Sequence, residues 1–245
     1  MNQLVILAGG KGTRMQSDRP KVLHNVKGIP IIKRLLRNVE NIFERPTIIV
    51  GYKGDEVIAE LGNGYLYVRQ PEQLGTGHAI LCAKSVLAHK GYQNILVTPG
   101  DSPLISSETL KKLVDLRQKK EAVISLAIVS VPHFEGDFAS FYNFGRVIRG
   151  DNEDVTGIVE LKDASEEQKR IGEVNTGYYC FDADWLWENI EKLKNENVAK
   201  EYYLTDMFRM AFEQGERIAA CVIENPYEGL GVNDKQQLAV AEAHC

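Results

Sequence analysis

The sequence lacks the features by which several protein classes are usually recognised. Its 245 residues include only four cysteines, with no Cys-x-x-Cys pair and no metal-site spacing. No apolar run approaches the roughly 20 residues of a membrane span. The N-terminus has no basic region followed by a long apolar stretch, so we expect no signal peptide and no membrane partner. Cys82, Cys180 and Cys221 lie in apolar runs, which predicts core positions in a reducing, cytoplasmic compartment.

An excess of basic charge is also missing. The chain carries 29 basic and 34 acidic residues, a formal net charge of −5. This balance argues against a general nucleic-acid-binding protein. There is no repeat, long linker or low-complexity segment, and the length suits one α/β domain or a domain with a small insert. Any local cluster of positive charge is therefore to be interpreted as a site.

One such cluster follows the first apolar segment. Leu4-Val5-Ile6-Leu7 predicts a strand buried on both faces, and it runs into Ala8-Gly9-Gly10-Lys11-Gly12-Thr13-Arg14-Met15. The three glycines of this loop allow backbone N–H groups to approach a ligand. Lys11, Arg14 and, soon after, Lys21 add positive charge. Open α/β sheets bind nucleotides at such a turn, although a tight strand-to-helix turn with solvated charges gives the same pattern.

The two best-known glycine loops are absent here. A Walker loop requires Gly-Lys-Ser/Thr, whereas Lys11 precedes Gly12. The dinucleotide fingerprint requires a glycine three residues after Gly12, where the chain has Met15. The loop is therefore neither a standard ATPase loop nor a standard NAD loop.

Strand and helix patterns alternate through the first half of the chain, which predicts a parallel, doubly wound sheet. We expect strands near 4–7, 47–50, 65–68, 94–98 and 122–129, and helices near 31–41, 53–61, 75–88 and 107–120. The second half is less regular. Strands are expected near 142–149, 155–161, 173–181 and 217–223, with helices near 184–194, 206–214 and after 234 and an acidic-basic helical stretch from Lys162.

Two further stretches carry chemistry-bearing residues. Gly75-Thr76-Gly77 opens a helix with Thr76 as a plausible N-cap, and His78 in the first turn is expected to make a structural hydrogen bond. Asp101 follows the strand near 94–98, so its carboxylate is expected at the ligand crevice of the sheet. Each segment also has an ordinary interpretation, as a capped helix start or a turn.

Taken together and in this order, the motifs of the whole chain resemble those of the sugar-nucleotide pyrophosphorylases. Within that family the chain is most similar to the uridylyltransferase domain of the bifunctional N-acetylglucosamine-1-phosphate uridylyltransferase/glucosamine-1-phosphate acetyltransferases. The motifs are Leu7 to Met15, Pro20 to His24, Gln73 to Ala79, Gly100-Asp101, Phe144 to Arg146, Ile158 to Glu160, Lys162 to Ser165, Asn175 to Gly177, Glu201 to Asp206 and Gly231 to Asn233.

The resemblance implies a fold and an activity. The fold is a Rossmann-like three-layer α/β/α nucleotidyltransferase fold of the nucleotide-diphospho-sugar transferase type, with a small sugar-binding lobe. The chain is then a single domain, residues 1–245, with a nucleotide-binding half at about 1–130 and the sugar-binding lobe and closing elements at about 131–245. The activity is magnesium-dependent transfer of a uridylyl group from UTP to N-acetylglucosamine-1-phosphate. The partners are these small molecules, while the oligomeric state and the pathway stay open.

The resemblance also implies roles for particular residues. Arg14, Lys21 and Asp101 are the expected catalytic residues, with Arg14 and Lys21 on the phosphates, and Asp101 and Asn233 are the expected magnesium ligands. Nucleotide binding is expected at Leu7, Ala8, Gly9, Gly10, Lys11, Gly12, Thr13, Gln70, Gly75, Thr76 and Gly100, of which Leu7 to Gly10 hold uracil and ribose and Gln70, Gly75 and Thr76 recognise the base. Sugar binding is expected at Gly145, Glu160 and Asn175.

The sequence departs from the family pattern at a few positions, which keeps alternatives open. Gly9 stands where close relatives usually carry alanine, and Pro99 replaces a frequent aromatic residue. The Glu-Lys-Pro signature of the thymidylyl- and glucose-1-phosphate-type branches is absent. No hexapeptide repeats are present, so acetyltransferase activity is not carried over. Alternatives are dTTP, GTP or CTP, a glucosamine, galactosamine or glucose 1-phosphate, or a non-catalytic sugar-nucleotide sensor.

Overall fold

A nine-stranded mixed sheet forms the centre of the protein in the computed structural model, which describes residues 1–245. Seven strands follow one another in the order β11-β7-β10-β6-β1-β4-β5, and β8 and β9 extend from β10. The strands are β1 (Asn2–Ala8), β4 (Thr47–Val50), β5 (Leu66–Arg69), β6 (Asn94–Pro99), β7 (Ile124–Ser130), β8 (Arg146–Arg149), β9 (Val155–Val159), β10 (Glu173–Asp182) and β11 (Ile218–Val222). A separate two-stranded ribbon pairs β2 (Asn25–Val26) with β3 (Ile29–Pro30).

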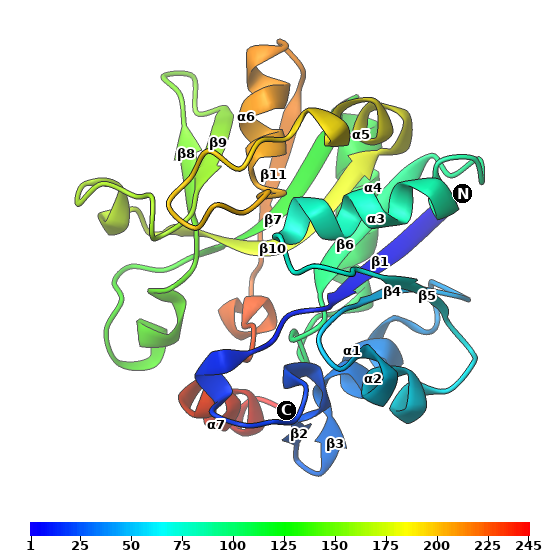
Figure 1. Ribbon diagram of the computed structural model, residues 1–245. Helices are drawn as coiled ribbons and strands as arrows, with labels where there is room; N and C mark the ends of the chain where they lie inside the picture. The colour runs from blue at the N-terminus through cyan, green and yellow to red at the C-terminus, as the bar shows by residue number, and fades with distance from the viewer.

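Seven α-helices cover the two faces of this sheet. They are α1 (Ile31–Val39), α2 (Gly54–Leu61), α3 (Thr76–Leu87), α4 (Ser107–Lys119), α5 (Ala183–Asn189), α6 (Asp206–Glu213) and α7 (Lys235–Ala243). Figure 1 shows α3, α5 and α6 on one side of the sheet, and α1, α2 and α7 on the other. Two separate apolar clusters match these sides, one including residues of α1, α2, α4 and α7 and the other residues of α3, α5 and α6. The three-layer α/β/α architecture expected from the sequence is therefore confirmed.

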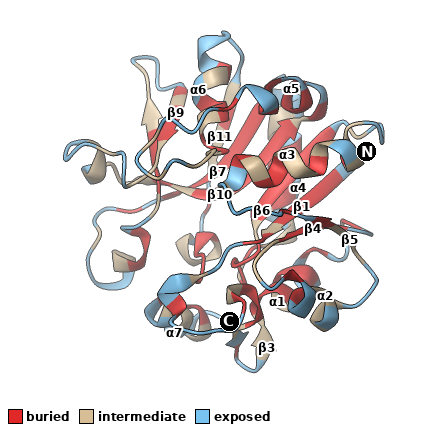
Figure 2. Ribbon diagram, in the orientation of Figure 1, coloured by how far each residue is buried: buried red, intermediate tan, exposed pale blue.

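Burial explains why β1 lies in the middle of the sheet. Leu4, Val5 and Ile6 are completely buried, with Leu4 and Ile6 in one apolar cluster and Val5 in the other. A strand that is apolar on both faces is stable only where helices cover both sides. Figure 2 shows this distribution, with buried residues concentrated in the sheet and exposed residues on the outer helix surfaces.

The strands of the first half run parallel, as their alternation with helices predicts, but the complete sheet is mixed. Strand β10 runs antiparallel between β6 and β7, so these two strands do not pair with each other. The other main-sheet neighbours, β1 with β4 and β6, β4 with β5, and β11 with β7, are parallel. Strand β10 belongs to the second half of the chain, and local strand-helix alternation carries no information about its insertion.

Two further local expectations need correction. The charged segment that begins at Lys162 forms no α-helix; it contains only a short 3-10 turn, η4 (Gln168–Arg170). It supplies no buried residue on that turn, so nothing compensates the cost of ordering a helix. Thr76 does not cap α3. The cap position is Gly75, and the Thr76 hydroxyl instead accepts a hydrogen bond from the Leu204 N–H at 3.0 Å.

None of the helices combines the length and the apolar character that a membrane-spanning segment needs. All four cysteines are free thiols. Cys180 is buried as expected, Cys82 and Cys221 are partly buried, and Cys245 is exposed.

Candidate functional site at the ends of the central strands

Strands β1 and β6 are parallel neighbours, so their carboxyl ends lie at the same edge of the sheet. The glycine-rich loop follows β1, and Gly100 and Asp101 follow β6. The Gly100 N–H donates to the Leu7 carbonyl at 2.9 Å, which ties the two strand ends together. A Cβ at Gly100 would lie 3.0 Å from that carbonyl, so a side chain there would strain this junction.

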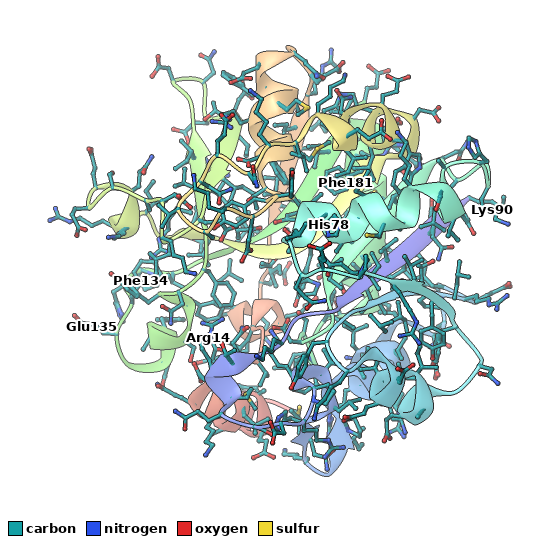
Figure 3. The ribbon with its side chains drawn as sticks, viewed as in Figure 1. Arg14, His78, Lys90, Phe134, Glu135 and Phe181 are labelled. Carbon is teal, nitrogen blue, oxygen red and sulfur yellow. The ribbon has the colours of Figure 1, made fainter.

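The glycine-rich loop brings Lys21 to this edge. Gly12 has a left-handed backbone conformation, φ +63°, and leads into the 3-10 turn η1 (Thr13–Met15). A Cβ at Gly12 would lie 2.6 Å from the Lys21 Cβ, so only glycine lets the Lys21 side chain cross the loop this closely. Arg14, on η1, and Lys11 are exposed, and neither forms an ion pair within the protein. Figure 3 marks the position of Arg14. Positive side chains therefore border a loop that has no acidic residue from Gly9 to Gln16.

Lys21, Asp101 and Asn233 meet although they are far apart in the sequence. The Lys21 ammonium forms an ion pair with the Asp101 carboxylate and donates to Asn233 Oδ1 at 2.7 Å. The Asn233 Nδ2 donates to the Gly231 carbonyl at 3.2 Å, which leaves Oδ1 facing Lys21. The Val232 N–H donates to the Asp101 carbonyl at 2.8 Å and holds the 231–233 segment beside β6. Two oxygen acceptors thus converge on one cationic group.

This donor set fits a magnesium ion. The Asp101 carboxylate oxygen and the Asn233 amide oxygen both face the Lys21 ammonium. Mg²⁺ likewise takes oxygen ligands, and it usually keeps several waters. The structure has no group of three or more His, Cys, Asp and Glu side chains arranged around one point. A magnesium ion here would therefore be held by Asp101 and Asn233 together with phosphate oxygens and water.

Three of the residues expected at the base, Gly9, Gln70 and Gly75, lie in contact with one another. Gln70 Nε2 donates to the Gly75 carbonyl at 2.9 Å, and a Cβ at Gly9 would lie 2.9 Å from Gln70 Oε1. Gly75 has φ +111°, and a Cβ there would lie 2.5 Å from the Tyr202 carbonyl, so this position requires glycine. Gly9, Gln70 and Gly75 are thus brought together, whereas the Thr76 hydroxyl is occupied by the Leu204 N–H.

The three expected sugar residues come together beside the β8–β9 hairpin. The Asn175 N–H donates to the Gly145 carbonyl at 2.9 Å, and a Cβ at Gly145 would lie 3.5 Å from Glu160 Oε2. Burial raises the pKa of the Glu160 carboxyl, and nearby carboxylates add to this, while the Thr205 hydroxyl, which donates at 3.1 Å, opposes it. Glu160 lines a cavity of about 710 Å³ between β9 and α6.

Sequence reasoning missed residues that hold the site residues in place. Thr205 orients Glu160, and the Tyr179 hydroxyl donates to Asn175 Oδ1 at 2.9 Å. Arg146 is completely buried and donates to the carbonyls of Tyr142, Phe144 and Lys169, which fixes the loop before Gly145. Arginine beside Gly145 was visible in the Phe144-Gly145-Arg146 motif, but nothing in the sequence indicated burial without a carboxylate partner.

Comparison with known proteins identifies the family. Residues 4–199 match the MobA-like NTP transferase domain. The chain belongs to this family. It is 41% identical over 245 residues to the bifunctional protein GlmU of Streptococcus sanguinis, covering 99% of this chain and 51% of that protein, and 42% identical over 240 residues to GlmU of Shouchella clausii, covering 98% and 51%. The chain therefore spans about half the length of these curated relatives. The resemblance argued from the motifs is confirmed.

Solved structures give the same fold at low sequence identity. A UDP-glucose pyrophosphorylase complexed with UDP-glucose superposes with a TM-score of 0.79 at 20% identity, covering 100% of this chain and 98% of that one. HddC from Yersinia pseudotuberculosis superposes with a TM-score of 0.71 at 21% identity, covering 100% and 99%. This NTP transferase domain therefore has the nucleotidyltransferase fold.

Proposed function

We propose that the protein transfers the uridylyl group of UTP to N-acetylglucosamine-1-phosphate in a magnesium-dependent reaction, giving UDP-N-acetylglucosamine and pyrophosphate. The convergence of Lys21, Asp101 and Asn233 beside a positively charged glycine loop is the observation that carries this proposal. The identity of about 40% to GlmU proteins supports the choice of nucleotide and sugar.

The proposed reaction needs no nucleophile from the protein. An oxygen of the sugar phosphate attacks the α-phosphorus of UTP in line, a new P–O bond forms, and the bond to the β-phosphate oxygen breaks to release pyrophosphate. Catalysis of this kind depends on positioning and on stabilising charge. Arg14 and Lys21 would neutralise the phosphate oxygens. Magnesium held by Asp101 and Asn233 would supply further neutralisation of phosphate charge when bound.

The sugar would be held by Gly145, Glu160 and Asn175. When ionised, Glu160 would accept hydrogen bonds from sugar hydroxyls. Asn175 Oδ1 already accepts from the Tyr179 hydroxyl and the Gly177 N–H, so the Asn175 amide nitrogen is the group that would donate to the sugar. The absence of a side chain at Gly145 leaves space next to Glu160 Oε2. These three residues would orient the 1-phosphate toward the nucleotide.

A panel of substrates tests the proposal. UTP, dTTP, GTP and CTP are each combined with N-acetylglucosamine-, glucosamine-, galactosamine- and glucose-1-phosphate, and pyrophosphate release is measured with magnesium and with excess chelator. We expect the highest kcat/KM for UTP with N-acetylglucosamine-1-phosphate, and loss of turnover in chelator that added magnesium restores. A preference for another nucleotide or another sugar phosphate would overturn the proposed substrates. Nucleotide binding without turnover would indicate a non-catalytic sensor.

A further inference from the structure

Gln70 lies in a short chain of hydrogen bonds that continues into α3. Its Nε2 donates to the Gly75 carbonyl at 2.9 Å and lies 3.2 Å from His78 Nδ1. The other ring nitrogen, His78 Nε2, lies 3.8 Å from Cys82 Sγ, one helical turn further on. Figure 3 shows His78 at the start of α3. The proposed reaction gives His78 and Cys82 no role.

The chemistry of the partners fixes the orientation of the Gln70 amide. A backbone carbonyl only accepts hydrogen bonds, so the Gln70 atom facing Gly75 is the NH₂ nitrogen and not the oxygen. Its second hydrogen is directed at His78 Nδ1, which must therefore be unprotonated. The ring proton then lies on Nε2, the nitrogen on the side of Cys82 Sγ. Burial raises the pKa of the Cys82 thiol, so the sulfur stays protonated.

With the NH₂ group held on this side, Gln70 Oε1 faces the glycine loop as an acceptor. It lies 2.9 Å from the position that a Cβ on Gly9 would take. The nearby Gly75 N–H forms no hydrogen bond within the protein. Gln70 Oε1 is an acceptor that matches the N3–H of uracil, and the Gly75 N–H is a donor that matches its O4. Cytosine carries an acceptor at N3 and an amino group at C4, so it would place like groups against each other.

We propose that His78 is a positioning residue for base selection: it holds the Gln70 amide so that its oxygen receives the imide proton of uracil and rejects cytosine. The inference rests on the proposed function, because it assumes that the base lies against Gln70 and Gly9. Without an acceptor at Nδ1, the Gln70 amide loses one of the two contacts that keep its oxygen toward the base. A site that hydrogen-bonds a base edge discriminates because the wrong base leaves buried polar groups unpaired.

Two substitutions separate this role from simple packing. Asparagine at position 78 places an amide oxygen where Nδ1 stands, whereas leucine has similar bulk and no acceptor. The ratio of dissociation constants for CTP over UTP is measured by calorimetry with magnesium for the wild type, His78→Asn and His78→Leu. We expect His78→Leu to lower this ratio by about tenfold, the scale of one buried hydrogen bond left unmade, and His78→Asn to retain most of it.

A second measurement uses the wild type, so it does not depend on how the variants fold. The ¹⁵N shifts of the His78 ring at neutral pH report which nitrogen carries the proton, and we expect Nε2–H. A protonated Nδ1, or an unchanged CTP/UTP ratio in folded His78→Leu, would overturn the inference while leaving the uridylyltransferase proposal intact. A wild type that binds neither nucleotide would instead remove the proposed function and base selection with it.

Discussion

At the scale of single residues, Lys21 has two partners that also suit a metal ion. Its ammonium is held by the Asp101 carboxylate and by Asn233 Oδ1, and its aliphatic chain lies against Gly12. Asp101 and Asn233 are also the two residues that would hold a magnesium ion. When a nucleotide is bound, the Lys21 ammonium would also be available to neutralise its phosphate oxygens.

Replacement of Lys21 by alanine tests whether this residue contributes to catalysis. We expect Lys21→Ala to lower kcat by about two to three powers of ten, the effect of removing one preorganised charge-stabilising group, while the dissociation constant for UTP changes little. Steady-state kinetics and calorimetry provide the two numbers. Lys90→Ala, a substitution of an exposed lysine beyond the end of α3, is the control and should change neither. An unchanged kcat in Lys21→Ala would remove this residue from the reaction.

Asp101 and Asn233 are the expected magnesium ligands, and only Asp101 carries a negative charge. We expect Asp101→Ala to abolish magnesium-dependent pyrophosphate release while the protein remains folded, since the side chain lies at a strand end and not within an apolar cluster. Circular dichroism and thermal unfolding check the fold. Near-normal turnover in a variant that melts like the wild type would exclude Asp101 from the site.

Glu160 gives a prediction of pH dependence. Burial raises its pKa above the ordinary value of 4.5, so the folded state disfavours the ionised form. For an acid with a raised pKa, stability is lost as the pH rises from the unfolded value through the folded value, and the loss then stays constant. We therefore expect Glu160→Gln to melt at a higher temperature than the wild type near pH 7.5 and at a similar one near pH 4, while KM for the sugar phosphate rises about tenfold or more.

The matched control is Glu167→Gln, since Glu167 is exposed. Thermal unfolding across pH 4 to 8 should show no pH-dependent gain for this control. A Glu160→Gln variant that is less stable than the wild type at neutral pH would mean that the carboxylate stabilises the fold, contrary to its raised pKa.

At the scale of elements, α4 begins with a side-chain cap that also ties it to a distant segment. Ser106 Oγ accepts from the Thr109 N–H at 3.1 Å and donates to Glu228 Oε1 at 2.8 Å. Loss of a serine cap costs about 1 kcal/mol. We expect Ser106→Ala to lower the free energy of unfolding by about 1 to 2 kcal/mol in urea titrations. Ser107→Ala, one residue into the helix, removes no cap and should cost less; equal losses in the two variants would contradict this assignment.

The elements also show how far sequence patterns reach. Strands β1, β4 and β6 and helices α1 and α4 could be predicted almost to the residue, because their apolar periodicity and the Pro30 and Ser106 start signals are local. The place of β10 could not, because pairing depends on packing between residues far apart in the chain. Likewise, Lys21, Asp101 and Asn233 could be named individually from the resemblance, but their contacts, across 80 and 212 positions, follow only from the sheet order.

At the scale of the whole molecule, the two halves of the chain share one sheet. Strand β7 pairs only with β10 and β11, both from residues after 172. We expect a fragment of residues 1–130 to lack cooperative thermal unfolding and to bind a hydrophobic dye, because it would leave β7 without partners and open one edge of β6. The full chain, treated identically, is the control. A sharp melting transition with native-like near-ultraviolet circular dichroism in the fragment would show that the first half folds alone.

The late arrival of β10 has a consequence during translation. A ribosome adds about 5 to 20 residues per second, so roughly 4 to 17 seconds pass between completion of β6 at Pro99 and completion of β10 at Asp182. Throughout this interval the backbone amides and carbonyls of β6 that pair with β10 lack their native partners. We expect the nascent chain to be most prone to pairing with other strands during this interval.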